Sequence, residues 1–173
     1  GKTALAAAIA AQWAQPHVFW FTLLPAQNDQ LSSLLFSLGY FLHRQGASGL
    51  WLQLVADNGK LDNPQLALKQ ARGALERLQL KPLLCIDEMD QLITAPERVT
   101  PAQQQQLSFF EGLRGVAPIL LVGQQVPILA DVHHVVEGLT PEQTRTLLAL
   151  NDVPHTGADA DRLQAMTGGN ARM

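Results

Sequence analysis

The sequence predicts an α/β fold, in which a parallel sheet flanked by helices is followed by the start of a small helical domain. Helical and strand patterns alternate along residues 1–139, which is typical of parallel strands joined by right-handed crossovers. Leu83–Glu88 is an apolar run that ends in two carboxylates, as expected of a strand buried on both faces. No strand pattern remains after Leu139, so residues 140–173 are assigned to the helical domain.

Length and composition fit this fold and restrict its partners. A chain of 173 residues with 47% apolar residues supports one α/β domain with a small appendage. The net charge of -3 gives no basic surface for direct nucleic-acid binding by this segment. The single cysteine, Cys85, excludes a disulfide framework and is interpreted as a core residue. The sequence shows neither a transmembrane pattern nor a signal-peptide pattern, so we expect a cytoplasmic protein.

The first element is a helix that begins at a phosphate-binding sequence. Gly1-Lys2-Thr3 opens a run of strong helix formers that continues to Trp13. This matches the closing half of the motif G-x-x-x-x-G-K-[ST], in which backbone N–H groups hold phosphate, the lysine reaches the β/γ-phosphates and the hydroxyl ligates Mg²⁺. The glycine-rich half of the motif would lie upstream, so we expect the chain to be a fragment of a longer protein.

The next elements are a strand and two helices. His17–Leu24 is rich in β-branched and aromatic residues and predicts a strand. Apolar residues recur at helical spacing from Leu31 to about Gln45, and we expect Asn28 or Asp29 to cap that helix. A further short helix is predicted over Leu50–Val55.

Helices also surround the acidic strand. Asn63-Pro64 predicts a capped helix start, and the helical pattern continues to about Leu80. Thr100–Gln103 forms a capping box that opens a helix to about Arg114. The four glutamines Gln103–Gln106 in its first turns are interpreted as a solvated turn.

The last part of the chain completes the sheet and begins the helical domain. Ile119–Gly123 predicts another fully buried strand, and His134–Leu139 predicts an edge strand. Thr140–Gln143 is a second capping box. A further short helix is expected over Ala158–Met166.

The carboxyl end of the acidic strand is the candidate catalytic position. Open α/β sheets bind their ligands beyond the carboxyl ends of such strands, where Asp87 and Glu88 fall. One carboxylate can hold Mg²⁺ through its water shell, and its neighbour can orient or deprotonate an attacking water. The alternative is a strand that ends in an acidic turn without chemistry. Asp90 is interpreted as a solvated carboxylate at a helix start.

The order of these motifs resembles the AAA-like STAND class of P-loop NTPases, the signal-transduction ATPases that include the NACHT and NB-ARC switches and several bacterial transcription regulators. The motifs that carry the resemblance are Gly1–Thr3, Asp87–Glu88, Gly123–Gln125, Gly138–Glu142 and Thr167–Asn170. It implies a three-layer parallel sheet of strand order 5-1-4-3-2, with strand 1 absent from this chain. We therefore expect the last strand, which would neighbour strand 1, to be displaced or poorly held.

The resemblance also implies roles for individual residues in binding ATP or ADP with Mg²⁺. Gly1 and Lys2 would contact the phosphates, and Thr3 would ligate Mg²⁺. Asp87 would hold the metal through water, and Glu88 would position or activate the attacking water.

Two further positions follow from the same resemblance. Gln124 or Gln125 matches the position that senses the γ-phosphate, and Gly168–Arg172 resembles the lid motif, from which Arg172 would reach the phosphates. Many members carry an arginine at the end of the fourth strand, where this chain has the two glutamines, and no arginine lies between Gly123 and Leu139. Since an arginine finger is worth about 10³ to 10⁵ in rate, its absence predicts slow turnover.

The leading hypothesis is therefore the nucleotide-binding core of a slow ATPase switch, which self-associates or meets a regulatory partner through other domains of the parent protein. The fragment by itself is expected to be inactive. One alternative is a scaffold module that keeps ADP bound and hydrolyses nothing. Another is a DNA-linked initiator or transposition ATPase of the AAA+ group, against which the lack of a basic surface argues.

Overall fold

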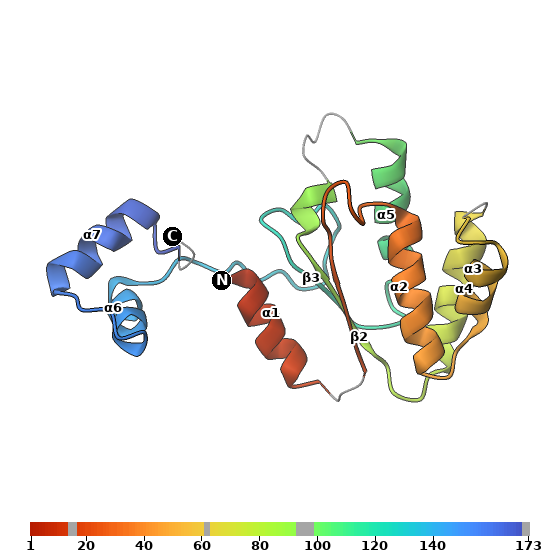
Figure 1. Cartoon of the computed structure of the whole chain (residues 1–173), viewed down its shortest axis with the longest axis horizontal. Helices are drawn as coiled ribbons and strands as arrows, with labels where there is room; N and C mark the ends of the chain where they lie inside the picture. The colour runs from red at the N-terminus through yellow and green to blue at the C-terminus, as the bar shows by residue number, and fades with distance from the viewer. Residues whose placement is uncertain (14–16, 61–62, 93–98, 171–173) are drawn as a thin grey trace. The chain divides into compact units, whose positions relative to one another are not determined.

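The computed structural model describes residues 1–13, 17–60, 63–92 and 99–170 (Figure 1). The chain divides into two compact units. The first, here called the sheet unit, is Leu5–Leu129, and the second, the helical unit, combines Gly1–Ala4 with Ala130–Met173.

The described part of the sheet unit contains a three-stranded parallel sheet in the order β1-β2-β3. The strands are β1 (Val18–Thr22), β2 (Leu83–Asp87) and β3 (Ile119–Leu121). This confirms the predicted α/β class with a parallel sheet. The observed order is also the one predicted for these three strands within 5-1-4-3-2, whereas the places of strands 1 and 5 stay a prediction.

Helices lie on both sides of this sheet, as Figure 1 shows. Alternate residues of β2 point to opposite faces, so Leu84 and Ile86 enter the larger core, whereas Leu83 and Cys85 pack against Ala10. Ala10 belongs to α1 (Lys2–Ala11). The larger core is formed with helices of the opposite face, which are α2 (Leu31–Arg44), α3 (Gly49–Ala56), α4 (Pro64–Arg77) and α5 (Pro101–Gly112).

Two predicted helix starts are confirmed. The side chain of Asn63 accepts the Leu66 N–H at 3.0 Å at the start of α4. Thr100 and Gln103 form the expected capping box of α5. In both cases the cap and its partner are three residues apart, so the local sequence is sufficient to predict the bond.

The prediction that Asn28 or Asp29 caps α2 is wrong. Gln30 occupies the cap position and no side chain bonds to the first turn. Asn28 Oδ1 instead accepts the Leu24 N–H at 2.7 Å, and Asp29 Oδ2 accepts the Ala26 N–H at 3.0 Å. Both side-chain oxygens, one from an amide and one from a carboxylate, therefore accept hydrogen bonds in the turn after β1, because Asn and Asp bond to nearby backbone there as readily as at a cap.

The interpretation of the four glutamines as a solvated turn is wrong for Gln106. This side chain is fully buried, although Gln104 and Gln105 are exposed. Gln106 is adjacent to Leu107 on the side of α5 that packs into the larger core. Its position on the helix, not its polarity, decides its burial.

Two strand predictions near the carboxyl edge of the sheet also need correction. β3 was expected to be fully buried, but its three residues are half-buried. In the described residues β3 pairs with β2 alone, so its outer edge has no strand to cover it. The predicted edge strand His134–Leu139 has no strand structure. Within the helical unit, Leu139 at the end of this segment donates its N–H to the Gly169 carbonyl at 2.9 Å.

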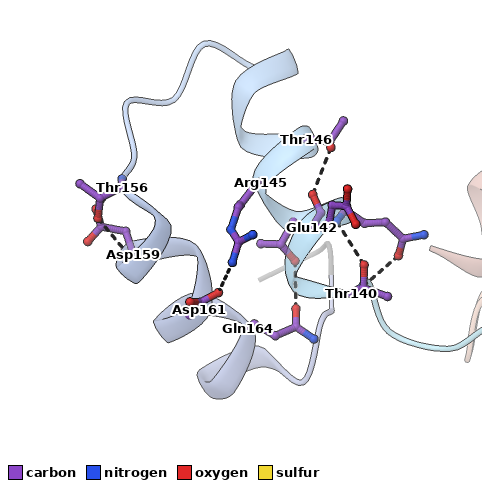
Figure 2. Close-up of polar contacts among 10 residues, drawn as sticks. Thr140, Glu142, Arg145, Thr146, Thr156, Asp159, Asp161 and Gln164 are labelled. Atoms are coloured by element: carbon purple, nitrogen blue, oxygen red, sulfur yellow. Dashed lines mark hydrogen bonds and ion pairs between the residues drawn. The ribbon is translucent and has the colours of Figure 1, made fainter.

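The helical unit contains α6 (Pro141–Leu150) and α7 (Gly157–Thr167). Thr140 caps α6 in the predicted capping box. The two helices are joined by the Arg145–Asp161 ion pair at 2.8 Å and by a hydrogen bond at 2.9 Å from the Thr144 hydroxyl to Gln164 Oε1 (Figure 2). No helix in the described part of the chain has the length and apolarity needed to cross a membrane.

Candidate functional site

Asp87 is the last residue of β2, the central strand of the described sheet. It is only 4% exposed. Because it is two residues beyond Cys85, it lies on the sheet face that α1 covers. Its Oδ1 accepts the N–H of Glu88 at 3.0 Å, which fixes the orientation of the carboxylate at the strand end.

Glu88 follows in a left-handed backbone conformation, with a φ of 60°. For a residue with a Cβ this conformation costs roughly 1–2 kcal/mol. The chain turns here towards β3, and the next residue, Met89, donates its N–H to the Val122 carbonyl at 2.8 Å. Backbone strain of this kind persists where the surrounding structure imposes it, and it is enriched at functional positions.

Asp90 joins the acidic turn to the end of β3. It lies in the short 3₁₀ helix η1 (Met89–Leu92), is half-buried, and accepts the Gln124 N–H on Oδ1 at 2.9 Å. Gly123 permits this approach, because a Cβ there would lie 2.8 Å from Asp90 Oδ1 and 3.1 Å from Asp90 N. The expected position of Asp90 at a helix start is confirmed, but its carboxylate is only partly exposed and bonds to the chain beyond β3.

The structure brings part of the predicted site together. Asp87, Glu88 and Gln124 all lie at the carboxyl edge of β2 and β3, where Asp90 links the two strand ends. The side chains of Gln124 and Gln125 are exposed at this edge.

The other predicted site residues do not belong to the described part of the sheet unit. Lys2 and Thr3 form the first turn of α1, and Gly1–Ala4 fall in the helical unit, whereas Asp87 falls in the sheet unit. Arg172 lies outside the described residues. The preceding Gly168 and Gly169 have φ values of 59° and 78° and end α7 in a left-handed turn, so these two residues of the lid-like sequence have a structural role.

Cys85 is the nearest titratable neighbour of Asp87 along the strand. Burial and, to a lesser extent, the negative charge of Asp87 together raise the pKa of its thiol to about 11. The thiol is fully buried and stays protonated near neutral pH, which supports its interpretation as a core residue rather than a nucleophile.

The residues at this edge fit a magnesium ion better than a metal held by protein ligands alone. The described residues contain no group of three or more His, Cys, Asp or Glu side chains able to hold a metal. Mg²⁺ needs fewer protein ligands, because it keeps several waters and usually binds one or two carboxylates together with substrate phosphates. The buried, oriented carboxylate of Asp87 suits that role.

In comparisons with known proteins, no protein-family model, curated protein or solved structure matches this chain.

Proposed function

We propose that this chain is the core of a nucleotide-binding ATPase switch of the STAND type, which binds ATP with Mg²⁺ and hydrolyses it slowly. The observation that carries the proposal is the pair Asp87 and Glu88 at the carboxyl end of the central strand, with Glu88 held at a φ of 60°. Ligands of open α/β sheets bind at this edge. Coupling to a regulatory partner, or self-association through other domains, belongs to the same proposal.

In this proposal the two carboxylates have different tasks. Asp87, whose Oδ1 is oriented by the Glu88 N–H, holds Mg²⁺ through water. When bound, the ion neutralises charge on the phosphates. Glu88 is half-buried beyond the strand end and orients the attacking water or accepts its proton. The roles of Lys2 at the β/γ-phosphates and of Thr3 at Mg²⁺ rest on the sequence resemblance alone.

The test combines binding and turnover, using the protein with the expected upstream half of the phosphate loop included. Calorimetry with ATP, ADP and Mg²⁺ should show binding that Lys2→Ala abolishes. Glu88→Gln should leave binding intact and lower ATP hydrolysis by roughly 10²-fold or more, as expected for loss of a general base. Glu111→Gln, which removes an exposed carboxylate from α5, should change neither quantity.

Two results would contradict the proposal in separable ways. Turnover that is unchanged in Glu88→Gln would remove Glu88 from the catalytic role but leave the nucleotide site standing. Absence of ATP and ADP binding in the wild-type protein would remove the nucleotide site itself.

The residues that follow β3 favour a second possible function, a scaffold that keeps ADP bound without hydrolysing ATP. Exposed Gln124 and Gln125 stand there, and neither glutamine carries the charge with which an arginine would respond to a γ-phosphate. A module that keeps ADP bound as a structural element needs no such charge. It would bind ADP with Mg²⁺ in the same calorimetric assay and show no turnover in either the wild type or Glu88→Gln.

A further inference from the structure

A cavity of about 650 Å³ lies at the opposite, amino-terminal edge of the sheet. Its walls are His17 before β1, the turn between α2 and α3, the last turns of α4 and the residues that lead into β2. β1 and β2 are parallel, so their amino ends share this edge. Five strand residues, or about 16 Å, separate it from Asp87. Its volume is in the range of small-molecule sites.

The charge of the cavity is positive, although the chain carries a net charge of -3. Among the described residues that line it there is no Asp or Glu, whereas the cation Arg77 is one of them. Arg77 donates its Nε–H to the Gly73 carbonyl at 2.7 Å. No other described residue pairs with the two terminal guanidinium nitrogens, which match carboxylate and phosphate oxygens in a bidentate manner.

The amino end of α3 adds donors to the same cavity. Ser48 is the cap residue and lines the cavity with Gly49. The Ser48 hydroxyl is engaged with His43 Nδ1 at 2.8 Å and does not cap the helix. The first turn also has no acidic residue. Helix amino ends that lack these partners favour a negatively charged group.

From this combination we propose that the cavity binds a small organic anion, in which a carboxylate or phosphate group is attached to a short carbon chain. The anionic group meets Arg77 and the amino end of α3. This site is independent of the proposed nucleotide site, and its test does not depend on ATP binding.

Gly49 provides the sharpest test, because its φ is not left-handed and a Cβ there has no atom within 4 Å. Both Gly49→Ala and Gly49→Glu therefore fit the fold, and they differ in the charge placed at the cavity. The probes are glycerol 3-phosphate and lactate, with glycerol as the neutral control. Their binding is measured by calorimetry and by changes in the amide chemical shifts of residues 46–49. A thermal unfolding curve of each variant shows that it is folded.

We expect glycerol 3-phosphate or lactate to bind the wild type with a Kd of about 1 mM or lower, a weak but measurable affinity. Gly49→Ala should bind equally well, whereas Gly49→Glu and Arg77→Gln should each weaken binding by about tenfold or more. Arg44→Gln, which removes an exposed cation of α2 that does not line the cavity, should have no effect. The probe that binds identifies phosphate or carboxylate as the anionic group. If neither probe binds, if glycerol binds equally well, or if Gly49→Glu binds like the wild type, the proposal is overturned.

Discussion

The contact between Gly123 and Asp90 gives the most direct test of the acidic edge. In Gly123→Ala the new Cβ would lie 2.8 Å from Asp90 Oδ1, 3.1 Å from Asp90 N and 3.3 Å from the Gln125 carbonyl oxygen. Two of these three neighbours are backbone atoms, which cannot move aside as the end of a flexible side chain can. We therefore expect the end of β3 to separate from η1 and the Gln124–Asp90 hydrogen bond to be lost.

The magnitude follows from three contributions. Overpacking of this kind costs about 1–3 kcal/mol, and the lost hydrogen bond costs about 0.5–1.5 kcal/mol. Replacing glycine by alanine returns about 0.4–1 kcal/mol through the unfolded chain. The net expectation is a loss of about 2 kcal/mol in the free energy of unfolding, or a fall of about 1 M in the urea midpoint at an m value near 2 kcal/mol/M.

Urea titration followed by tryptophan fluorescence is the appropriate assay. The three tryptophans, Trp13, Trp20 and Trp51, all belong to the sheet unit. Gly73→Ala is the matched control, because Gly73 lies within α4 and its Cβ would meet only the end of the Arg77 side chain, at 3.4 Å. That variant should be more stable by about 0.5–1 kcal/mol. A Gly123→Ala midpoint that is unchanged, or that rises as in the control, would refute the close approach and with it the role of Asp90.

Three further predictions concern other parts of the chain. Gly169→Ala should lower the free energy of unfolding by about 2–3 kcal/mol, because Gly169 has a left-handed φ of 78° and a Cβ there would overlap the backbone of residue 139. Amide exchange at residue 139 should become roughly 30-fold faster. The control Gly157→Ala, with open space around its Cβ, should change neither quantity. The pKa of Cys85 is raised from 9.0 to about 11, so the folded protein favours the protonated thiol. The contribution of this thiol to the free energy of unfolding should be fully present below about pH 9 and fall by about 2–3 kcal/mol as the pH rises to about 11. Urea midpoints measured across that range should show the decline in the wild type and not in Cys85→Ala. Gln106→Met should raise the free energy of unfolding by about 1–2 kcal/mol in the same titration, because both amide atoms of Gln106 are buried without partners in the described structure.

The features predicted from the sequence are those set by neighbouring residues. Asn63 and Thr100 were identified as caps because their partners are three residues away. The acidic strand was identified because Leu83–Asp87 is apolar until its last residue and is buried along its whole length. The order of the three strands followed from the resemblance of the motif order to P-loop NTPases, and the structure agrees for those three.

The features that were missed depend on residues far apart in the chain. Asp90 is bonded to Gln124, 34 residues away, and no local pattern indicates that bond. Gln106 is buried because of the face of α5 on which it lies, although a run of glutamines suggests solvent. His134–Leu139 has the composition of a strand, but strand structure also needs a neighbouring strand to accept its hydrogen bonds.

The acidic turn differs from an ordinary strand end in the residue that occupies its strained position. A turn that only ends a strand and needs a φ near 60° is best served by glycine, or by asparagine, at lower conformational cost. Here the position holds Glu88, and bonds on both sides maintain it: Asp87 Oδ1 accepts its N–H, and Met89 donates to Val122. The Asp90–Gln124 bond then fixes the following 3₁₀ turn against β3. Ala26, in the turn after β1, has the same φ of 60°, so the conformation alone does not distinguish a functional residue from an ordinary turn. What distinguishes Glu88 is that these bonds place a carboxylate beyond the central strand, where the proposed function needs a residue that orients a water.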